Sequence, residues 1–151
     1  MGDVRRAGPV DAATVATLLH DFNTEFDTPT PGVDVLTTRL RQRLGSDDLV
    51  ALLHDDPPDG LAVVSFRPNV WFDGPVALLD ELYVRPDRRG RRIGHALIEA
   101  VESLARERGG RIVEVNVDGE DVDARRFYAA HGYAFIEPGA TEPSYYYAKE
   151  W

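Results

Sequence analysis

The segment Leu78–Leu97, LLDELYVRPDRRGRRIGHAL, runs from an apolar strand pattern through an arginine-rich turn into the start of a helix. The first N–H groups of a helix have no partners within it, and the helix dipole adds partial positive charge at that end. Gly90 and Gly94 allow the backbone to turn sharply and to approach a ligand closely. The turn carries five arginines and one aspartate: Arg85, Arg88, Arg89, Arg91, Arg92 and Asp87. The segment therefore predicts an anion site, with a solvated basic surface as the alternative.

The net charge of the chain and the spacing of the glycines in the turn disfavour several classes of anionic ligand. The chain has a formal net charge of −9, which disfavours a nucleic-acid partner away from this turn. The turn lacks the Gly-Lys-Ser/Thr ending of a Walker loop, and Gly90-x-x-x-Gly94 is not a dinucleotide-binding Gly-x-Gly-x-x-Gly. A phosphate-bearing ligand of another kind is favoured.

Two blocks of sequence carry a resemblance to a known family. Residues 84–96, VRPDRRGRRIGHA, resemble the acyl-CoA-binding motif of the GNAT superfamily of N-acyltransferases, Arg/Gln-x-x-Gly-x-Gly/Ala. Arg92 stands where the first motif glycine is usual. Residues 121–133, DVDARRFYAAHGY, resemble the family's Asn-x-x-Ala-x-x-Phe-Tyr-x-x-x-Gly-Phe block, with Asp121 for Asn and Tyr133 for Phe. The two blocks occur in the family's order, separated by one helix and one strand.

The length of 151 residues suits one domain, and we expect a single GNAT-like domain over residues 1–151. The patterns predict strands at 4–7, 49–54, 61–67, 77–84, 112–117, 133–136 and 145–148. They predict helices opening near Pro9 and broken after Phe22, and at 33–44, 92–108 and 123–131. This order fits the fold that the resemblance implies, an α/β fold with a mixed, mostly antiparallel sheet and helices on both sides.

The resemblance implies acetyl-CoA as the acyl donor and no metal. The strands 78–84 and 112–117 would splay apart, and the backbone of Leu82, Tyr83 and Val84 would bind the pantetheine arm. The pyrophosphate would be wrapped by the turn, comprising Arg89, Gly90, Arg91, Arg92, Ile93, Gly94, His95 and Ala96. Asn116, Asp121 and Ala124 are further candidate contacts. For Asn116 the alternative is a polar strand end, and for Asp121 it is a helix cap.

Acyl transfer to an amine needs a neutral amine, a stabilised intermediate, a protonated leaving thiolate and good alignment. The resemblance implies direct attack in a ternary complex, and the absence of cysteine removes the commonest covalent nucleophile. Tyr128 is the candidate general acid. Glu81 is the candidate general base, directly or through water, and strand alternation places it on the face of Tyr83 and opposite Asp80 unless a bulge intervenes. The alternative for Tyr128 is aromatic packing, and the alternative for Glu81 is a solvated carboxylate at a strand end.

The acceptor wall is expected in the connector 20–32 and near the C-terminus, with candidates Phe22, Glu25, Phe26 and Tyr145. Aromatic rings together with carboxylates favour a small cationic amine. The alternatives are an acetyltransferase of protein amino groups and a non-catalytic acyl-CoA-binding module. The histidines His20, His54 and His131 show no metal-ligand spacing. With no apolar stretch of membrane-spanning length, we expect a cytoplasmic protein without membrane contact, and the resemblance allows a homodimer.

Overall fold

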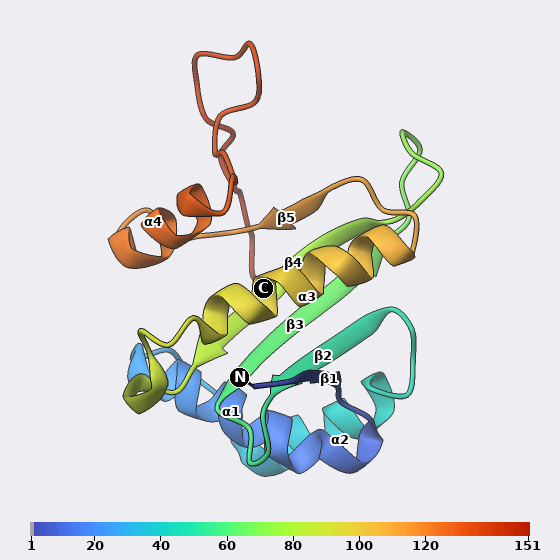
Figure 1. Cartoon of the computed structure of the whole chain (residues 1–151), viewed down its shortest axis with the longest axis vertical. Coiled ribbons are helices and arrows are strands. Elements are labelled where there is room, and N and C mark those ends of the chain that lie inside the picture. Colours follow the sequence, from blue (N-terminus) through green and yellow to red (C-terminus); the bar gives the residue numbers. More distant parts are fainter. Residues whose placement is uncertain (1) are drawn as a thin grey trace. The chain divides into compact units, whose positions relative to one another are not determined.

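The computed structural model describes residues 2–151, and the chain divides into two compact units, with the boundary in the sequence between Val115 and Asn116. The first unit holds a five-stranded sheet in the order β1-β2-β3-β4-β5 (Figure 1). Its strands are β1 (Val4–Arg6), β2 (Leu49–His54), β3 (Gly60–Arg67), β4 (Val76–Val84) and β5 (Val113–Val115). Neighbouring strands are antiparallel except β4 and β5, which are parallel. The predicted mixed, mostly antiparallel sheet is confirmed.

Helices cover both faces of this sheet (Figure 1). The first unit contains α1 (Ala12–Glu25), α2 (Val33–Arg43) and α3 (Ile93–Glu107), and the second contains α4 (Val122–Ala130). A short 3₁₀ turn at Pro9–Asp11 precedes α1, which continues to Glu25, beyond the predicted break after Phe22. The remaining helices begin and end within two residues of the predicted bounds, because apolar residues recur at helical spacing along each of them.

The core explains which side chains face which helix. Apolar residues of α1 and α2 pack against alternate residues of β2, β3 and β4, including Leu53, Leu61, Val63 and Tyr83. On the other face α3 lies close to β3, because Gly60 has no side chain: a Cβ there would lie 2.8 Å from Ile93 Cγ2. This close approach places the first turn of α3, and with it the arginine-rich turn, beside the end of β4.

A bulge in β4 changes the direction of two carboxylates. Val63 pairs with Glu81 and Val64 pairs with Leu79, which leaves Asp80 as the extra residue. Glu81 and Tyr83 share one face of β4, as predicted, and the structure shows that α1 packs on this face. Asp80 does not point to the opposite face: it accepts a hydrogen bond from Ser65, which lies on the same face as Val63. The prediction for Asp80 is wrong, because the bulge interrupts the alternation.

The ladder between β4 and β5 covers only Ala77–Leu79 against Val113–Val115. From Asp80 to Val84 the described residues provide no strand partner on that side of β4. An extended ligand can pair like a strand with the backbone of this segment, apart from the Val84 carbonyl, which accepts a hydrogen bond from Arg89 Nε.

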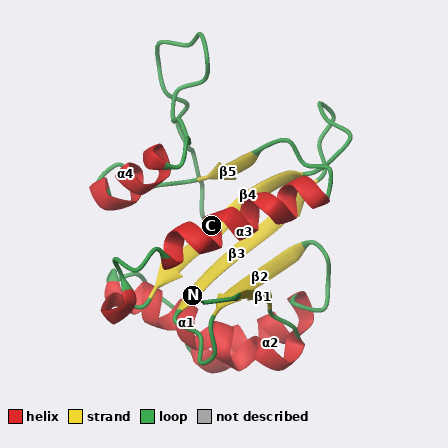
Figure 2. Cartoon of the chain, viewed as in Figure 1, coloured by secondary structure: helices red, strands yellow, loops and turns green. Residues whose placement is uncertain are grey.

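The strands predicted at 133–136 and 145–148 are wrong. The second unit contains α4 and otherwise turns and irregular backbone, drawn as loop in Figure 2. The residues have the right side-chain types, but a strand exists only where another strand satisfies its backbone groups. No helix among the described residues is both long enough and apolar enough to cross a bilayer.

Candidate functional site

The arginine-rich turn has the backbone geometry of an anion site. Residues 86–88 form a 3₁₀ turn, and Gly90, with φ of 77°, then reverses the chain toward α3. Residues 85–92 are all exposed, whereas Ile93 is buried and anchors the first turn of the helix. Among the described residues, the guanidinium groups of Arg88, Arg91 and Arg92 make no ion pair. The turn thus joins helix N-terminal amides with exposed cationic side chains, a combination suited to a diphosphate.

Arg92 shows why a glycine is usual at its position in the motif. Its φ is 63° and its ψ is 21°, the left-handed conformation that glycine adopts without a Cβ clash. Arg92 thus adopts the backbone conformation that the motif glycine would have, at the cost of strain. Its side chain adds a cation at the N-terminus of α3.

Replacing Arg92 by glycine should therefore stabilise the fold. We expect Arg92→Gly to raise the free energy of unfolding by about 0.5–1 kcal/mol, the relief of left-handed strain less the greater entropy of the unfolded chain. Urea denaturation measures this difference. Arg91→Gly is the matched control: Arg91 has no positive φ, so the same exchange should destabilise. Equal effects of the two exchanges would show that strain at Arg92 is not involved.

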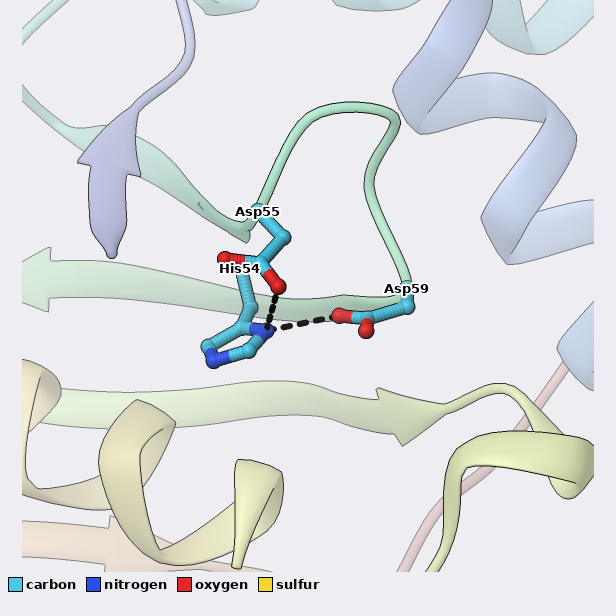
Figure 3. A group of neighbouring side chains, drawn as sticks. All are labelled: His54, Asp55 and Asp59. Carbon is cyan, nitrogen blue, oxygen red and sulfur yellow. Dashed lines mark hydrogen bonds and ion pairs between the residues drawn. The ribbon is translucent and has the colours of Figure 1, made fainter. Parts of the chain in front are cut away.

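A buried pair of side chains supports the beginning of the turn (Figure 3). His54 Nδ1 lies 2.6 Å from Asp59 Oδ1, and both side chains are buried. The loop that carries Asp59 holds Arg85 twice: the Arg85 N–H donates to the Asp59 carbonyl at 2.9 Å and its Nε donates to the Pro58 carbonyl at 3.1 Å. The pair thereby positions the residue that leads from β4 into the anion site.

The same histidine belongs to a cluster that sequence spacing did not reveal. In Figure 3 the carboxylates of Asp55 and Asp59 both approach His54 Nδ1, and potential metal-ligand atoms of the three residues lie within 4.8 Å of one another. The His54–Asp59 separation of 2.6 Å is that of a hydrogen bond, and the Asp55 oxygen lies farther away, at 3.8 Å. The arrangement is therefore that of a hydrogen-bonded structural pair with a second carboxylate nearby.

An acidic pocket, wide open to solvent, lies where the end of α1 meets the arginine-rich turn. Its volume is about 350 Å³, and it is lined by Asp21, Thr24, Glu25, Tyr83, Arg85, Pro86 and Asp87. Burial raises the pKa of Tyr83, and the nearby charges of Glu25 and Asp21 raise it further. Asp21 belongs to the connector 20–32 in which the sequence placed the acceptor wall, whereas Asp87 is a pocket residue that sequence reasoning missed.

The predicted acceptor residues differ in their surroundings. Phe22 stacks on Tyr83 with ring centres 5.0 Å apart and packs against the core, and it is not among the residues that line the acidic pocket. Phe26 is about half exposed at the end of α1. Glu25 lines the acidic pocket and forms two hydrogen bonds with Arg89. Arg89 thus has a carboxylate partner at the position where the motif predicts a phosphate.

Glu81 lies half-buried on β4, in the segment without a partner strand. Burial raises the pKa of its carboxyl group, and the neighbouring Asp80 raises it further. A carboxylate with a raised pKa is a better proton acceptor near neutral pH than an exposed glutamate. The environment thus supports its candidacy as a base.

The second unit contains the other candidates. Tyr128 is half-buried on α4, with its ring 5.2 Å from that of Phe127 and 5.7 Å from that of Tyr133. Asp121 Oδ1 accepts a hydrogen bond from the Ala124 N–H at 3.0 Å, so the predicted helix cap is confirmed. Asn116 and Tyr145 are exposed, outside any helix or strand. In the first unit the His95 Nε2 lies 3.1 Å from a carboxylate oxygen of Glu99.

Comparison with known proteins supports the family on both sequence and fold. Residues 15–133 match the model of the Acetyltransferase (GNAT) family. The chain is 32% identical to aminoglycoside N(6')-acetyltransferase type 1 of Stenotrophomonas maltophilia, over 89% of this chain and 87% of that protein. A protein of Arthrobacter sp. FB24 with a known crystal structure is 62% identical in sequence to this chain. The two structures superpose with a TM-score of 0.93 over 99% of this chain and 96% of that one.

The fold is also similar to that of solved proteins whose sequences are much less similar. An aminoglycoside acetyltransferase from an uncultured soil metagenomic sample, solved with sisomicin, has a TM-score of 0.79 at 17% identity, covering 99% of this chain and 97% of that one. The family match extends over both units and includes both motif blocks. This chain therefore belongs to the GNAT family of acetyltransferases, whose acyl donor is acetyl-CoA.

Proposed function

We propose that this protein transfers the acetyl group of acetyl-CoA to a primary amine of a small cationic molecule. The acidic pocket carries the proposal: three carboxylates, those of Asp21, Glu25 and Asp87, line a space that also borders the anion site. Opposite charges raise the local concentration of a cationic ligand and orient it. The similarity to an aminoglycoside acetyltransferase over most of both chains supports the same class of acceptor.

The residues of the first unit fit the donor. Bound acetyl-CoA supplies an acyl thioester, which is reactive toward amines. The exposed residues 88–92 and the first amides of α3 offer N–H and guanidinium groups to its phosphates, and β4 offers backbone groups near Leu82, on the side without a partner strand, to its pantetheine arm. Binding of this kind holds the thioester for direct attack, which requires no nucleophile from the protein.

The reaction needs two proton transfers, and we assign one side chain to each. A new C–N bond forms as the C–S bond breaks, the amine loses one proton, and the departing thiolate gains one. Glu81, with its raised pKa, accepts the amine proton directly or through water. Tyr128, by resemblance to the motif of α4, donates the proton to the thiolate. Protons balance because Glu81 and Tyr128 exchange theirs with solvent before the next cycle.

Calorimetry with acetyl-CoA, followed by thiol release against a panel of amines, tests this function. The panel contains sisomicin, spermidine, lysine and a peptide with a free N-terminus. We expect acetyl-CoA to bind and thiol release to depend on the polycationic small molecules. Release with the peptide alone would indicate a protein acceptor, binding without release would favour a non-catalytic module, and absence of binding would contradict the proposal.

A further inference from the structure

One ion pair connects the acceptor pocket to the anion site. Glu25, the last residue of α1, accepts hydrogen bonds from Arg89 at 2.8 Å and 2.9 Å, one to each carboxylate oxygen. The Nε of Arg89 donates to the carbonyl of Val84 at 3.0 Å. The two side chains remain accessible, with 27% of Glu25 and 44% of Arg89 exposed. The pair is well formed but open to competition from solvent and from ligands.

Each partner has a second binding role available. A guanidinium group binds phosphate with the same two-pronged geometry that it uses for a carboxylate, and a phosphate brings more charge. Arg89 also lies 5.9 Å from the centre of the Tyr83 ring. If Arg89 turns to a phosphate, both the carboxylate of Glu25 and the ring of Tyr83 become available to another cation.

We propose that acyl-CoA binding transfers Arg89 from Glu25 to the donor's phosphates, and that Glu25 then pairs with a cationic group of the acceptor. This inference rests on the proposed function and specifies how its two sites are coupled. The donor removes a positive charge from the acidic pocket and leaves Asp21, Glu25 and Asp87 facing Arg85, whose Nε is held by Pro58. By linkage, donor and acceptor each increase the affinity of the other by the same factor.

Calorimetry with CoA alone tests the first half of this exchange, in wild type and in Glu25→Gln, without any acceptor. Removal of the competing carboxylate should tighten CoA binding by about threefold to fivefold, at the upper end of the range for an accessible ion pair because the contact has two hydrogen bonds. Asp21→Asn is the matched control, because it removes the same charge from the same pocket and the same helix, outside the anion turn, and Asp21 makes no ion pair among the described residues. We expect its CoA affinity to change by less than about twofold.

Sisomicin binding, measured with and without saturating CoA, tests the second half. Wild type should bind sisomicin more tightly with CoA present, whereas Glu25→Gln should bind it more weakly and with no dependence on CoA. Thermal melting checks that the variants are folded. Weaker CoA binding by Glu25→Gln would identify the pair as a structural contact and overturn the inference. A wild-type sisomicin affinity that does not change when CoA is added would also overturn it.

The outcomes separate this inference from the proposed function. If wild type binds no CoA, both fail. If CoA binds equally to wild type and Glu25→Gln, the exchange is wrong while acetyl transfer stands. If sisomicin binds in no state, the acceptor class is wrong, and the effect of Glu25→Gln on CoA affinity still decides whether Arg89 is exchanged.

Discussion

Tyr128→Phe should lower kcat by about a hundredfold or more with little change in the KM for acetyl-CoA, the size expected when a general acid is removed. The variant keeps the ring that contacts Phe127 and Tyr133 and loses only the hydroxyl group. A thiol has a pKa of about 8.5, so its thiolate leaves more easily when a proton is supplied during bond cleavage. Steady-state kinetics with thiol detection measures the effect.

Two comparisons separate acid catalysis from packing. Tyr133→Phe removes the same atom from a neighbouring ring and should change kcat by less than about twofold. An acetyl thioester of a more acidic thiol needs less protonation, so it should restore much of the rate of Tyr128→Phe. Equal losses in both tyrosine variants, or no rescue by the better leaving group, would remove Tyr128 from the mechanism.

Glu81→Gln should lower kcat by about a hundredfold near neutral pH and abolish the acidic limb of the pH–rate profile. Burial and Asp80 raise the pKa of Glu81 in the folded protein. A base must be deprotonated, so the wild-type rate should rise as the pH rises through this pKa. The glutamine variant has no carboxyl group to titrate, and its residual rate should lack that limb.

The same pKa shift has an opposite effect on stability. A folded-state pKa above the unfolded value means that the folded protein binds the proton more tightly, so this group destabilises the fold increasingly as the pH rises through the shift. Glu81→Gln should therefore raise the free energy of unfolding at neutral pH while activity falls. Loss of both activity and stability would instead indicate a structural carboxylate.

Asp80→Asn provides the matched control for Glu81. It removes the neighbouring charge that raises the pKa of Glu81 and leaves the carboxyl group of Glu81 in place. The acidic limb should persist and move to lower pH. An acidic limb that does not move in Asp80→Asn, or that survives in Glu81→Gln, would assign the limb to another group.

Local patterns predicted most of the elements because they follow from side chains that are close in sequence. Helical spacing of apolar residues located α2 and α3, and β2 was predicted at its observed bounds, where a short apolar run precedes a loop rich in proline and aspartate. The same reasoning failed for 133–136 and 145–148, where the residues favour strands and residues 2–151 contain no strand that pairs with them. A strand is a pairwise structure, so composition alone cannot guarantee it.

The sequence by itself determined the anion turn, the two motif blocks and, through them, the family. These features lie in short continuous segments, and their chemistry follows from spacing and helix polarity. Only the tertiary structure decided how the carboxylates are used. The bulge in β4 places Asp80 on the same face as Glu81. The loop after β2 brings Asp59 to His54, and folding brings Glu25 to Arg89, which is 64 positions away in the sequence. Such contacts depend on how strands and helices pack, because residues distant in the chain meet only when the core forms.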